Sequence, residues 1–370
     1  MMKAEYKRLG DYIVAVDERN SDLSITLSQG INNNKYFQQP RQVAENSSND
    51  KIVRRGYFAY NRATTRNGDK ISIAYREGED CTVSAAYQVF FIKNEDLLNP
   101  HYLLLWFKRP TFDRYARFKS HGSAHEFFEW DEMCNVMLPV PSIEEQRRIV
   151  AQYQTVENRI KNNERLIALL EDTAQTIFRH RFIDNIDTNN LPEGWRMGTL
   201  SDIAEYCSDR IDTAELNSST YISTENMLKD RGGIKEAESV PSGKCIKFHT
   251  DDILISNIRP YFKKIWRSTF DGGCSADVLC IRTKSGFYPE YTYSIVEREH
   301  YFDYVTAGSK GTKMPRGDRE WNMKYEIPIP SSKDMDEFHR EVKQVRNYID
   351  NLRRECSLLS EVKEVLTNSL

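Results

Sequence analysis

The stretch GSAHEFFEWDEMCNVMLPVPS, from Gly122 to Ser142, has a counterpart in GTKMPRGDREWNMKYEIPIPS, from Gly311 to Ser331. The leading glycines, the closing serines and the two prolines before each serine occupy matching places, always 189 residues apart. The same offset joins four further pairs: Pro100 with Pro289, Tyr102 with Tyr291, Tyr115 with Tyr304, and Ser120 with Ser309. A repeat of this length predicts that one structural plan is built twice along the chain.

The amino-side halves of the two copies match more loosely. RLGDYI around Leu9 resembles TLSDIA around Leu200, and ITLSQGI from Ile25 resembles YISTENM from Tyr221. SAAYQVFFI from Ser84 aligns with SADVLCI from Ser275. We expect a mixed α+β body in each copy, with strands at 88–92 and 277–281 and a helix that begins at Pro100 or Pro289.

A helical pattern follows each body. In the first copy, residues spaced alternately by four and three form a seam with one polar member: Ile149, Tyr153, Val156, Ile160, Asn163, Ile167, Leu170, Ala174 and Ile177. In the second copy the seam is Phe338, Val342, Val345, Ile349, Leu352, Cys356, Leu359, Lys363 and Leu366. This spacing predicts coiled-coil helices, with Ser142 and Ser331 as their N-caps. Lys363 is the weak seam position, and Val362 is the alternative to it.

Connectivity then predicts the architecture. The first helix leads to the second body, and the second helix has only the first to pack against, so the two helices should be antiparallel. We therefore predict an α+β protein that is a pseudo-two-fold tandem repeat: two mixed α/β domains (1–141 and 185–330) separated by a long antiparallel two-helix coiled coil (142–184 and 331–370). Asn163 would set the register of the coiled coil. The alternative is that both helices are core helices of one fused domain.

Composition limits the functional classes. A formal net charge of −3 excludes a globally basic nucleic-acid binder, so any DNA contact must come from local patches. The seven cysteines contain no CxxC pattern, which indicates free thiols in the cytoplasm. We expect neither a leader peptide nor a membrane span, because the chain starts MMKAEYKRLGDY and its apolar runs are short.

Two segments in each copy carry side chains suited to DNA. One segment of each copy combines asparagine with cations and is expected to read base edges: Asn61, Arg62, Arg66, Asn67 and Lys70 in the first copy, and Asn257, Arg259, Lys263 and Lys264 in the second. The alternative is a polar hairpin turn at Asn67–Gly68.

The other segment is expected to contact phosphates. It contributes Arg114, Arg117, Lys119, His121, Ser123 and His125 in the first copy, following Lys108 and Arg109, and Lys310, Thr312, Lys313 and Arg316 in the second copy. Glycines at 122 and 311 would let the backbone approach the DNA closely. The alternative is a solvated surface loop in each copy.

Catalytic and metal-binding patterns are weak. NPHY at Asn99–Tyr102 resembles the motif with which adenine methyltransferases hold the target amine, but its repeat partner YPEY lacks the asparagine. A proline at a helix start accounts for both copies. The chain has neither a glycine-rich cofactor turn nor a phosphate loop, and its histidines show no metal-ligand spacing. We therefore expect no catalytic residue and no metal site.

The run P-x-P-S-x-x-E-Q-x-x-I, from Pro139 to Ile149, and LPEGW at Leu191–Trp195 resemble the specificity subunits of type I restriction-modification systems. The resemblance covers essentially the whole chain. It departs at PIPSSKDMDEF, in the second copy, which lacks the Glu-Gln pair.

The resemblance implies a non-catalytic subunit with a target-recognition domain at each end of the coiled coil, recognising an asymmetric bipartite DNA sequence. It implies as partners double-stranded DNA, two methyltransferase subunits, and restriction subunits with helicase and nuclease activities. S-adenosylmethionine, ATP and Mg would be used by those partners, and this chain would bind no cofactor. We expect partner docking at four exposed helix residues: Glu145, Gln146, Arg147 and Arg148. The alternative is a duplicated coiled-coil adaptor, for DNA or for proteins, outside any restriction system.

Overall fold

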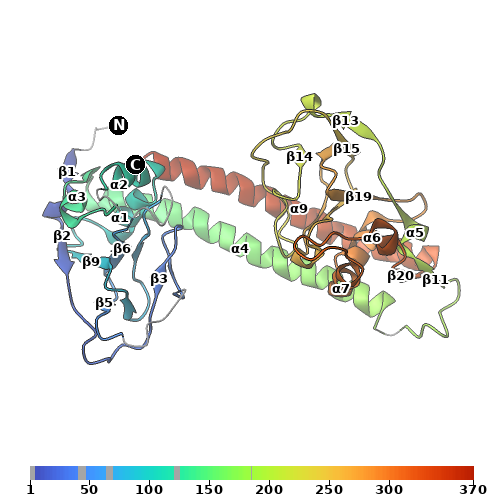
Figure 1. The fold of residues 1–370 in the computed structure, drawn as a ribbon, viewed down its shortest axis with the longest axis horizontal. Coiled ribbons are helices and arrows are strands. Elements are labelled where there is room, and N and C mark those ends of the chain that lie inside the picture. The colour runs from blue at the N-terminus through green and yellow to red at the C-terminus, as the bar shows by residue number, and fades with distance from the viewer. Residues whose placement is uncertain (1–4, 41–46, 64–69, 121–125, 185) are drawn as a thin grey trace. The chain divides into compact units, whose positions relative to one another are not determined.

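The computed structural model describes residues 5–40, 47–63, 70–120, 126–184 and 186–370. The chain divides into two compact units, one made of residues 1–162 and 356–370 and the other of residues 163–355. Two long helices, α4 (Ile143–Phe182) and α9 (Ser332–Asn368), each contribute residues to both units. The elements are labelled in Figure 1.

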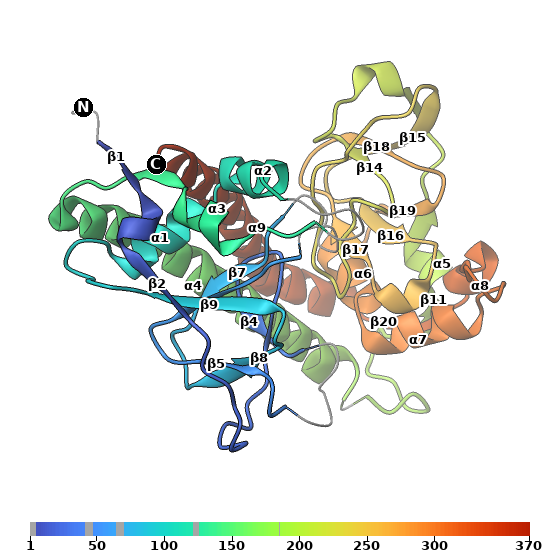
Figure 2. The ribbon, with the colours of Figure 1, turned by 60° about the vertical axis from the view of Figure 1, so that its left-hand side comes forward.

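The first unit has a four-stranded antiparallel sheet in the order β2-β9-β6-β7 and three strand pairs, β1-β10, β3-β4 and β5-β8. Its strands are β1 (Tyr6–Arg8), β2 (Ile13–Val16), β3 (Gly30–Ile31), β4 (Phe37–Gln38), β5 (Lys51–Val53), β6 (Phe58–Asn61), β7 (Ile73–Tyr75), β8 (Cys81–Val83), β9 (Tyr87–Ile92) and β10 (Met137–Pro139). Its short helices are α1 (Pro100–Phe107), α2 (Pro110–Phe118) and α3 (Trp130–Cys134). Figure 2 shows α1 next to the sheet strands β9 and β7.

The second unit repeats this plan. Its strands are β11 (Arg196–Thr199), β12 (Ala204–Tyr206), β13 (Arg210–Asp212), β14 (Tyr221–Ile222), β15 (Lys244–Phe248), β16 (Ile253–Ser256), β17 (Ile265–Arg267), β18 (Gly272–Cys274), β19 (Val278–Thr283) and β20 (Glu326–Ile329). Its short helices are α5 (Leu200–Ile203), α6 (Pro289–Val296), α7 (Glu299–Ala307) and α8 (Arg319–Met323). The sheet β12-β19-β16-β17 corresponds to β2-β9-β6-β7, and the pair β11-β20 corresponds to β1-β10. The predicted tandem repeat is confirmed.

Alternation along the strands gives each main sheet two apolar faces. In β16, Ile253 and Ile255 join one cluster of buried side chains, whereas Leu254 between them joins another. In β6, Phe58 and Tyr60 likewise belong to one buried cluster, and Ala59 between them belongs to another. Successive side chains of a strand point to opposite faces, so a sheet that is apolar on both faces must be covered twice.

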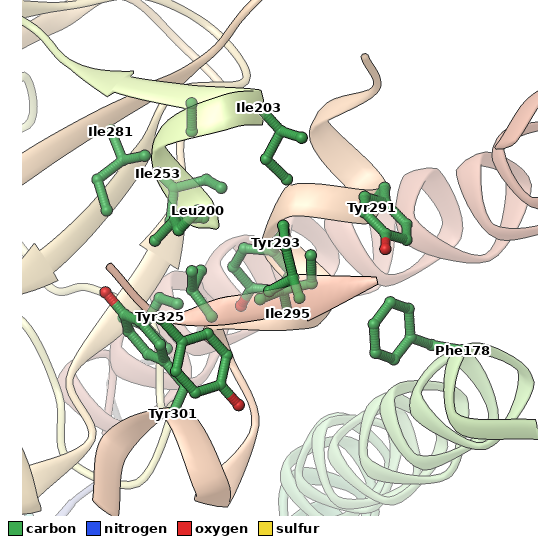
Figure 3. Close-up of a cluster of buried hydrophobic side chains, with 14 of the residues drawn as sticks. Phe178, Leu200, Ile203, Ile253, Ile281, Tyr291, Tyr293, Ile295, Tyr301 and Tyr325 are labelled. Atoms are coloured by element: carbon green, nitrogen blue, oxygen red, sulfur yellow. The ribbon is translucent and has the colours of Figure 1, made fainter. Parts of the chain in front are cut away.

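Helices cover one face of the second unit's main sheet. Figure 3 shows Ile253 and Ile281 of the sheet, Tyr291 and Ile295 of α6, and Phe178 of α4 in one buried cluster. The ring centroids of Phe178 and Tyr291 lie 5.6 Å apart. The other face belongs to a cluster that includes Phe248 of the smaller sheet β13-β15-β18-β14. The long helices are therefore part of the unit's core.

The long helices agree with the seam pattern. They begin at Ile143 and Ser332, and the hydroxyls of Ser142 and Ser331 accept hydrogen bonds from the amides of Glu145 (3.3 Å) and Asp334 (3.2 Å), so both N-caps are confirmed. Every predicted seam residue is buried or half-buried.

Ion pairs between the helices give their direction. Glu157 pairs with Lys363 at 3.0 Å in the first unit. In the second unit, Glu171 pairs with Arg353 (2.5 Å), and Arg181 pairs with both Glu341 (2.6 Å) and Glu337 (3.6 Å). Residue numbers rise along one helix as they fall along the other, so the predicted antiparallel coiled coil is confirmed.

Lys363 remains in the seam, and the alternative that Val362 replaces it is wrong. Lys363 pairs with Glu157 and lies over the ring of Tyr153, with its Nζ 5.3 Å from the ring centroid. Val362 is 45% exposed. A long cationic side chain can cover apolar surface while its ammonium group reaches a carboxylate, which explains why the seam tolerates a lysine.

The structure explains why the tyrosines Tyr102 and Tyr291 occupy matching places in the two copies of the repeat. The Tyr102 hydroxyl donates to the Pro139 carbonyl at 2.9 Å, and the Tyr291 hydroxyl donates to the Pro328 carbonyl. Each tyrosine therefore joins the first main helix of its unit to the strand that leads into a long helix. Asn99, which precedes Pro100, caps α1 by accepting from two backbone amides, as expected for a helix start.

A charged contact lies where the first main helix of each unit ends. In the second unit, Glu297 after α6 forms a buried ion pair with Arg346 of α9. In the first unit the equivalent positions hold Lys108 and Glu157, and the Tyr36 hydroxyl links them. It accepts from Lys108 Nζ at 3.0 Å and donates to Glu157 at 3.2 Å. The repeat has kept the contact and inverted its polarity.

We expect Glu297→Ala to lower the free energy of unfolding by about 3–5 kcal/mol, because it leaves Arg346 charged, buried and without its carboxylate. Urea denaturation of the chain measures this. Glu145→Ala breaks an exposed pair with Arg148 and is the control, with a much smaller expected loss because solvent screens this pair. Equal losses in the two variants would contradict the importance of the buried pair.

Candidate nucleic-acid interface

The first predicted segment of the first unit follows β6. The Asn61 amide oxygen accepts the backbone amide of Ala63 at 3.1 Å, so this asparagine shapes a turn. Arg62 donates to Glu129 at 2.9 Å and lies over the ring of Phe127. Lys70 is exposed, and Arg66 and Asn67 lie outside the described residues. Among the described residues of this segment, Lys70 is therefore the one whose side chain is exposed to solvent.

The second predicted segment of the first unit belongs to α2 and the residues after it. Arg114 is exposed, while Arg117 pairs with Glu126 and Lys119 with Glu132 at 3.6 Å. Three further predicted residues lie outside the described residues: His121, Ser123 and His125.

The backbone brings the two segments of the first unit together. The Phe128 amide donates to the Arg62 carbonyl at 2.8 Å, and Ala63 and Phe127 form an antiparallel bridge. Residues more than sixty positions apart in the sequence therefore form one surface.

The second unit repeats this pairing. Ile258 bridges Arg316, the Arg259 amide donates to the Pro315 carbonyl at 2.8 Å, and the Gly317 amide donates to the Asn257 carbonyl at 3.0 Å. A Cβ atom at Gly317 would lie 2.8 Å from the Asn257 amide oxygen, so glycine is what permits this close approach. The two copies thus share one way of joining their predicted DNA-contacting segments.

Backbone strain concentrates in this part of the second unit. Arg259 and Lys263, on either side of the turn at Pro260–Phe262, have φ angles of 50° and 51°. Asp230 and Arg231, with φ angles of 52° and 61°, donate their amides to the carbonyls of Phe262 and Lys263, both at 2.9 Å. Left-handed conformations are uncommon for residues other than glycine and often mark functional loops.

Acidic neighbours hold several of the predicted cations. Three ion pairs are formed: Lys263 with Glu299 (2.5 Å), Lys310 with Asp318 (2.7 Å) and Arg316 with Asp277 (3.0 Å). The Lys263 hydrogen bond helps hold the pKa of Glu299 below its usual value. Lys264 donates to the Thr224 carbonyl at 2.6 Å, and burial together with nearby Lys229 lowers its pKa. Thr312 and Lys313 are exposed.

Sequence reasoning missed a third loop. Lys229 lies over the ring of Phe262 at 4.0 Å, and Arg231 donates to the Glu297 carbonyl at 2.6 Å. In the first unit, Lys35 donates to the carbonyl of Phe107 at 2.5 Å, one residue before Lys108, the equivalent of Glu297. A signal for this loop was present in the sequence, because NNNKY and LKDRGG directly follow the aligned stretches that end at Ile31 and Met227.

One predicted partner-docking residue is wrong. Gln146 is fully buried, and its side chain accepts from the Asn99 amide at 2.8 Å and donates to the Leu97 and Pro141 carbonyls. It joins α4 to the start of α1, so it cannot meet a partner. Among the other three predicted residues, Glu145 and Arg148 pair with each other, and Arg147 pairs with Asp96 at 3.4 Å.

All seven cysteines are free thiols, as predicted. Cys207, Asp252 and Cys280 lie close enough in the second unit to be compared with a metal site. Arg282 donates to both oxygens of Asp252 at 2.8 and 2.6 Å, so the carboxylate already has a cationic partner. The arrangement fits a buried ion pair next to two thiols better than a site for a metal ion. Across the part of the chain that the structure describes, no helix combines the length and the apolar character needed to cross a lipid bilayer.

Residues 10–172 match the family described as the type I restriction modification DNA specificity domain. The EcoDI specificity subunit of a type I restriction enzyme from Escherichia coli is 26% identical over 209 residues, which are 55% of this chain and 45% of that protein. The MjaIX specificity subunit of Methanocaldococcus jannaschii is 24% identical over 303 residues, which are 73% of this chain and 67% of that protein. The match to the Escherichia coli protein thus spans less than half of that relative's length.

A solved structure has the same fold. The S subunit of a type I restriction-modification system from M. genitalium superimposes with a TM-score of 0.56, at 11% identity, over 99% of this chain and 96% of that chain. The likeness concerns the arrangement of elements and therefore supports the two-domain, two-helix fold.

We expect Arg259→Gly to weaken DNA binding about tenfold while keeping or raising the free energy of unfolding. The free energy of unfolding is kept or raised because glycine removes a penalty of about 1–2 kcal/mol for the left-handed backbone. DNA binding weakens because the variant lacks the guanidinium group, a charged hydrogen-bond donor. Titration with duplex DNA and urea denaturation measure the two effects. Leu23→Gly, at a left-handed residue (φ 56°) of the first unit, is the control and should relieve strain with DNA binding unchanged. Equal DNA affinities in both variants would exclude this turn from the interface.

Proposed function

Because residues 10–172 carry the type I restriction modification DNA specificity domain, and the chain has the fold of a specificity subunit, we propose that it selects the DNA sequence on which a type I restriction-modification complex acts. One observation supports this most directly. Each unit joins two cation-bearing segments through an equivalent bridge, Ala63 with Phe127 and Ile258 with Arg316, yet the side chains of the two copies differ. Two such surfaces suit two different half-sites.

The proposed recognition domains are residues 1–141 and 185–330, with the helices at 142–184 and 331–370 as the spacer between them. In this proposal, Arg114 and Lys70 contact DNA in the first unit, as do Arg259 and Lys313 in the second. Their cationic groups supply phosphate contacts, and an arginine can also read guanine bidentately. The target is an asymmetric split sequence because the two domains differ.

The chemistry belongs to partners in this proposal. Two methyltransferase subunits, using S-adenosylmethionine, modify adenine, and restriction subunits use ATP and Mg to translocate and cleave DNA. The chain itself binds none of these cofactors and acts in the cytoplasm. Glu145, Arg147 and Arg148 are the proposed docking residues on α4, and Gln146 instead holds that end of the helix against the first unit.

A coiled-coil adaptor outside restriction systems is the competing function. The salt dependence of binding separates the two. A DNA-reading subunit that neutralises several phosphates loses affinity for DNA steeply as the salt concentration rises. A protein adaptor shows no such salt-dependent loss of DNA affinity.

We expect the chain, expressed with its methyltransferase subunit in a host without other modification, to direct adenine methylation to one split sequence. Long-read sequencing of the host DNA maps the methylated positions. Replacing residues 1–141 with the equivalent domain of a relative should change one half-site and leave the other, because each unit reads its own half.

A four-residue insertion in the middle of α4, with the same length added to α9, is the matched control. This insertion should change the number of base pairs between the two half-sites and leave the sequence of both half-sites unchanged. A domain replacement that changes both half-sites would contradict the proposal that each unit reads one half-site. Methylation that persists without this chain would contradict it as well.

A further inference from the structure

The first unit contains a cavity of about 900 Å³ bordered by the β3–β4 loop, α2, α4 and the last turns of α9. Cationic side chains dominate its lining: Lys35, Lys70, Lys108, Arg114, Arg117 and Lys363. Among the described residues of the lining, Asp113 is the single acidic one. A cavity with this composition has a positive potential and attracts anions.

Half of these cations already have acidic partners. The pairs are Lys35 with Asp113 at 2.6 Å, Lys363 with Glu157 at 3.0 Å, and Arg117 with Glu126. Lys70, Lys108 and Arg114 form no ion pair with any residue that the structure describes. Lys70 and Arg114 thus remain to meet an external anion, and Lys108 reaches Glu157 only through the Tyr36 hydroxyl.

Lys108 is the most enclosed of the three. Its Nζ donates to the Tyr36 hydroxyl at 3.0 Å and lies 4.7 and 5.3 Å from the ring centroids of Tyr36 and Tyr153. Burial lowers its pKa to about 8, and nearby Lys363 and Lys161 add to this effect while Glu157 opposes it. An anion beside Lys108 would compensate the cost of keeping this cation away from water.

The second unit shows that this charge is not a by-product of the duplicated fold. Glu297 replaces Lys108 at the equivalent position, and Ala174 occupies the place on the helix pair that corresponds to Lys363. The nearby cavity of about 450 Å³ has four acidic side chains in its lining, Glu171, Asp172, Glu297 and Glu299, beside three arginines and a histidine. An excess of cations distinguishes the first unit.

We propose that the cavity of the first unit binds a phosphate group, with Lys70, Lys108 and Arg114 as its ligands. Guanidinium and ammonium groups form strong, short hydrogen bonds to phosphate oxygens. The phosphate can come from the DNA backbone or from a free nucleotide. Lys70 follows the predicted base-reading residues Arg66 and Asn67 closely in the sequence, which favours the DNA backbone. That choice of source rests on the proposed DNA-binding function; the site itself does not.

The test uses the full chain in complex with its methyltransferase partner and two variants, Lys108→Met and Arg114→Met. Arg114 is exposed and has no ion pair with described residues, so we expect its replacement to leave the fold of the unit intact. Arg179→Met, in the charge-balanced cavity of the second unit, is the matched control. The probes are a target duplex, a non-target duplex of equal length, and inorganic pyrophosphate.

If the DNA backbone is the source, each variant binds both duplexes about tenfold more weakly, and the slope of log K against log salt falls by about 0.9 for each lost contact. The methylated sequence itself stays the same, because a phosphate contact carries no base information. If a free nucleotide is the source, pyrophosphate binds the wild type saturably and the variants do not, while DNA binding is unchanged.

The site is overturned if the variants show no reduced salt slope and the wild type shows no saturable pyrophosphate binding. The proposed function fails separately, if the wild-type complex methylates no defined sequence. Equal weakening by Arg179→Met would also overturn the proposal, because it would assign the effect to overall charge.

Discussion

Each unit depends on one charged contact between the end of its first main helix and the helix pair. Lys108 reaches Glu157 through the Tyr36 hydroxyl, and Glu297 meets Arg346 directly. Buried charges are costly unless they are paired, so this contact fixes where the unit lies along its helices. Because the polarity is inverted, exchanging the partners would place Lys108 against Arg346, a repulsion between like charges. Each unit therefore fits its own half of the coiled coil.

The same contact organises the loops that we assign to DNA. Tyr36 belongs to the loop that also carries Lys35, and Arg231 in the equivalent loop donates to the carbonyl of Glu297, a member of the buried pair. The backbone of Arg231 in turn holds the left-handed turn at Lys263. Strained loops persist where rigid neighbours determine them, and here the neighbours are the helices and the buried ion pair.

Repetition and periodicity made the architecture predictable. The 189-residue offset and the alternating steps of four and three indicated two equivalent bodies and an antiparallel helix pair, because both depend on local pattern alone. Gln146 shows where this reasoning stops. Its polar side chain predicted exposure, but its amide satisfies backbone groups at Leu97, Asn99 and Pro141, a need that only the folded chain creates.

The candidate interface was predictable only in part for the same reason. Charge in the sequence located the segments after Asn61 and Asn257, and the bridges between segments join them into surfaces. Sequence could not show that Arg62, Arg117 and Lys119 are held by acidic neighbours, since those partners follow from tertiary packing. Lys229 and Arg231 were missed because their contacts with the Phe262 ring and the Glu297 carbonyl arise only in the folded unit.

Duplication gives both units the same scaffold, so their differences report what each is specialised for. In the first unit, three cations around one cavity have no ion pair with described residues, which suits contacts to phosphate that are independent of sequence. In the second unit, three of the six predicted cations are paired with acidic side chains, and the backbone of the loops is closely defined. Paired cations add little net attraction for DNA, but fixed loops can present hydrogen-bond donors at set positions. Under the proposed function, an asymmetric target is expected because the predicted base-reading side chains differ between the two units.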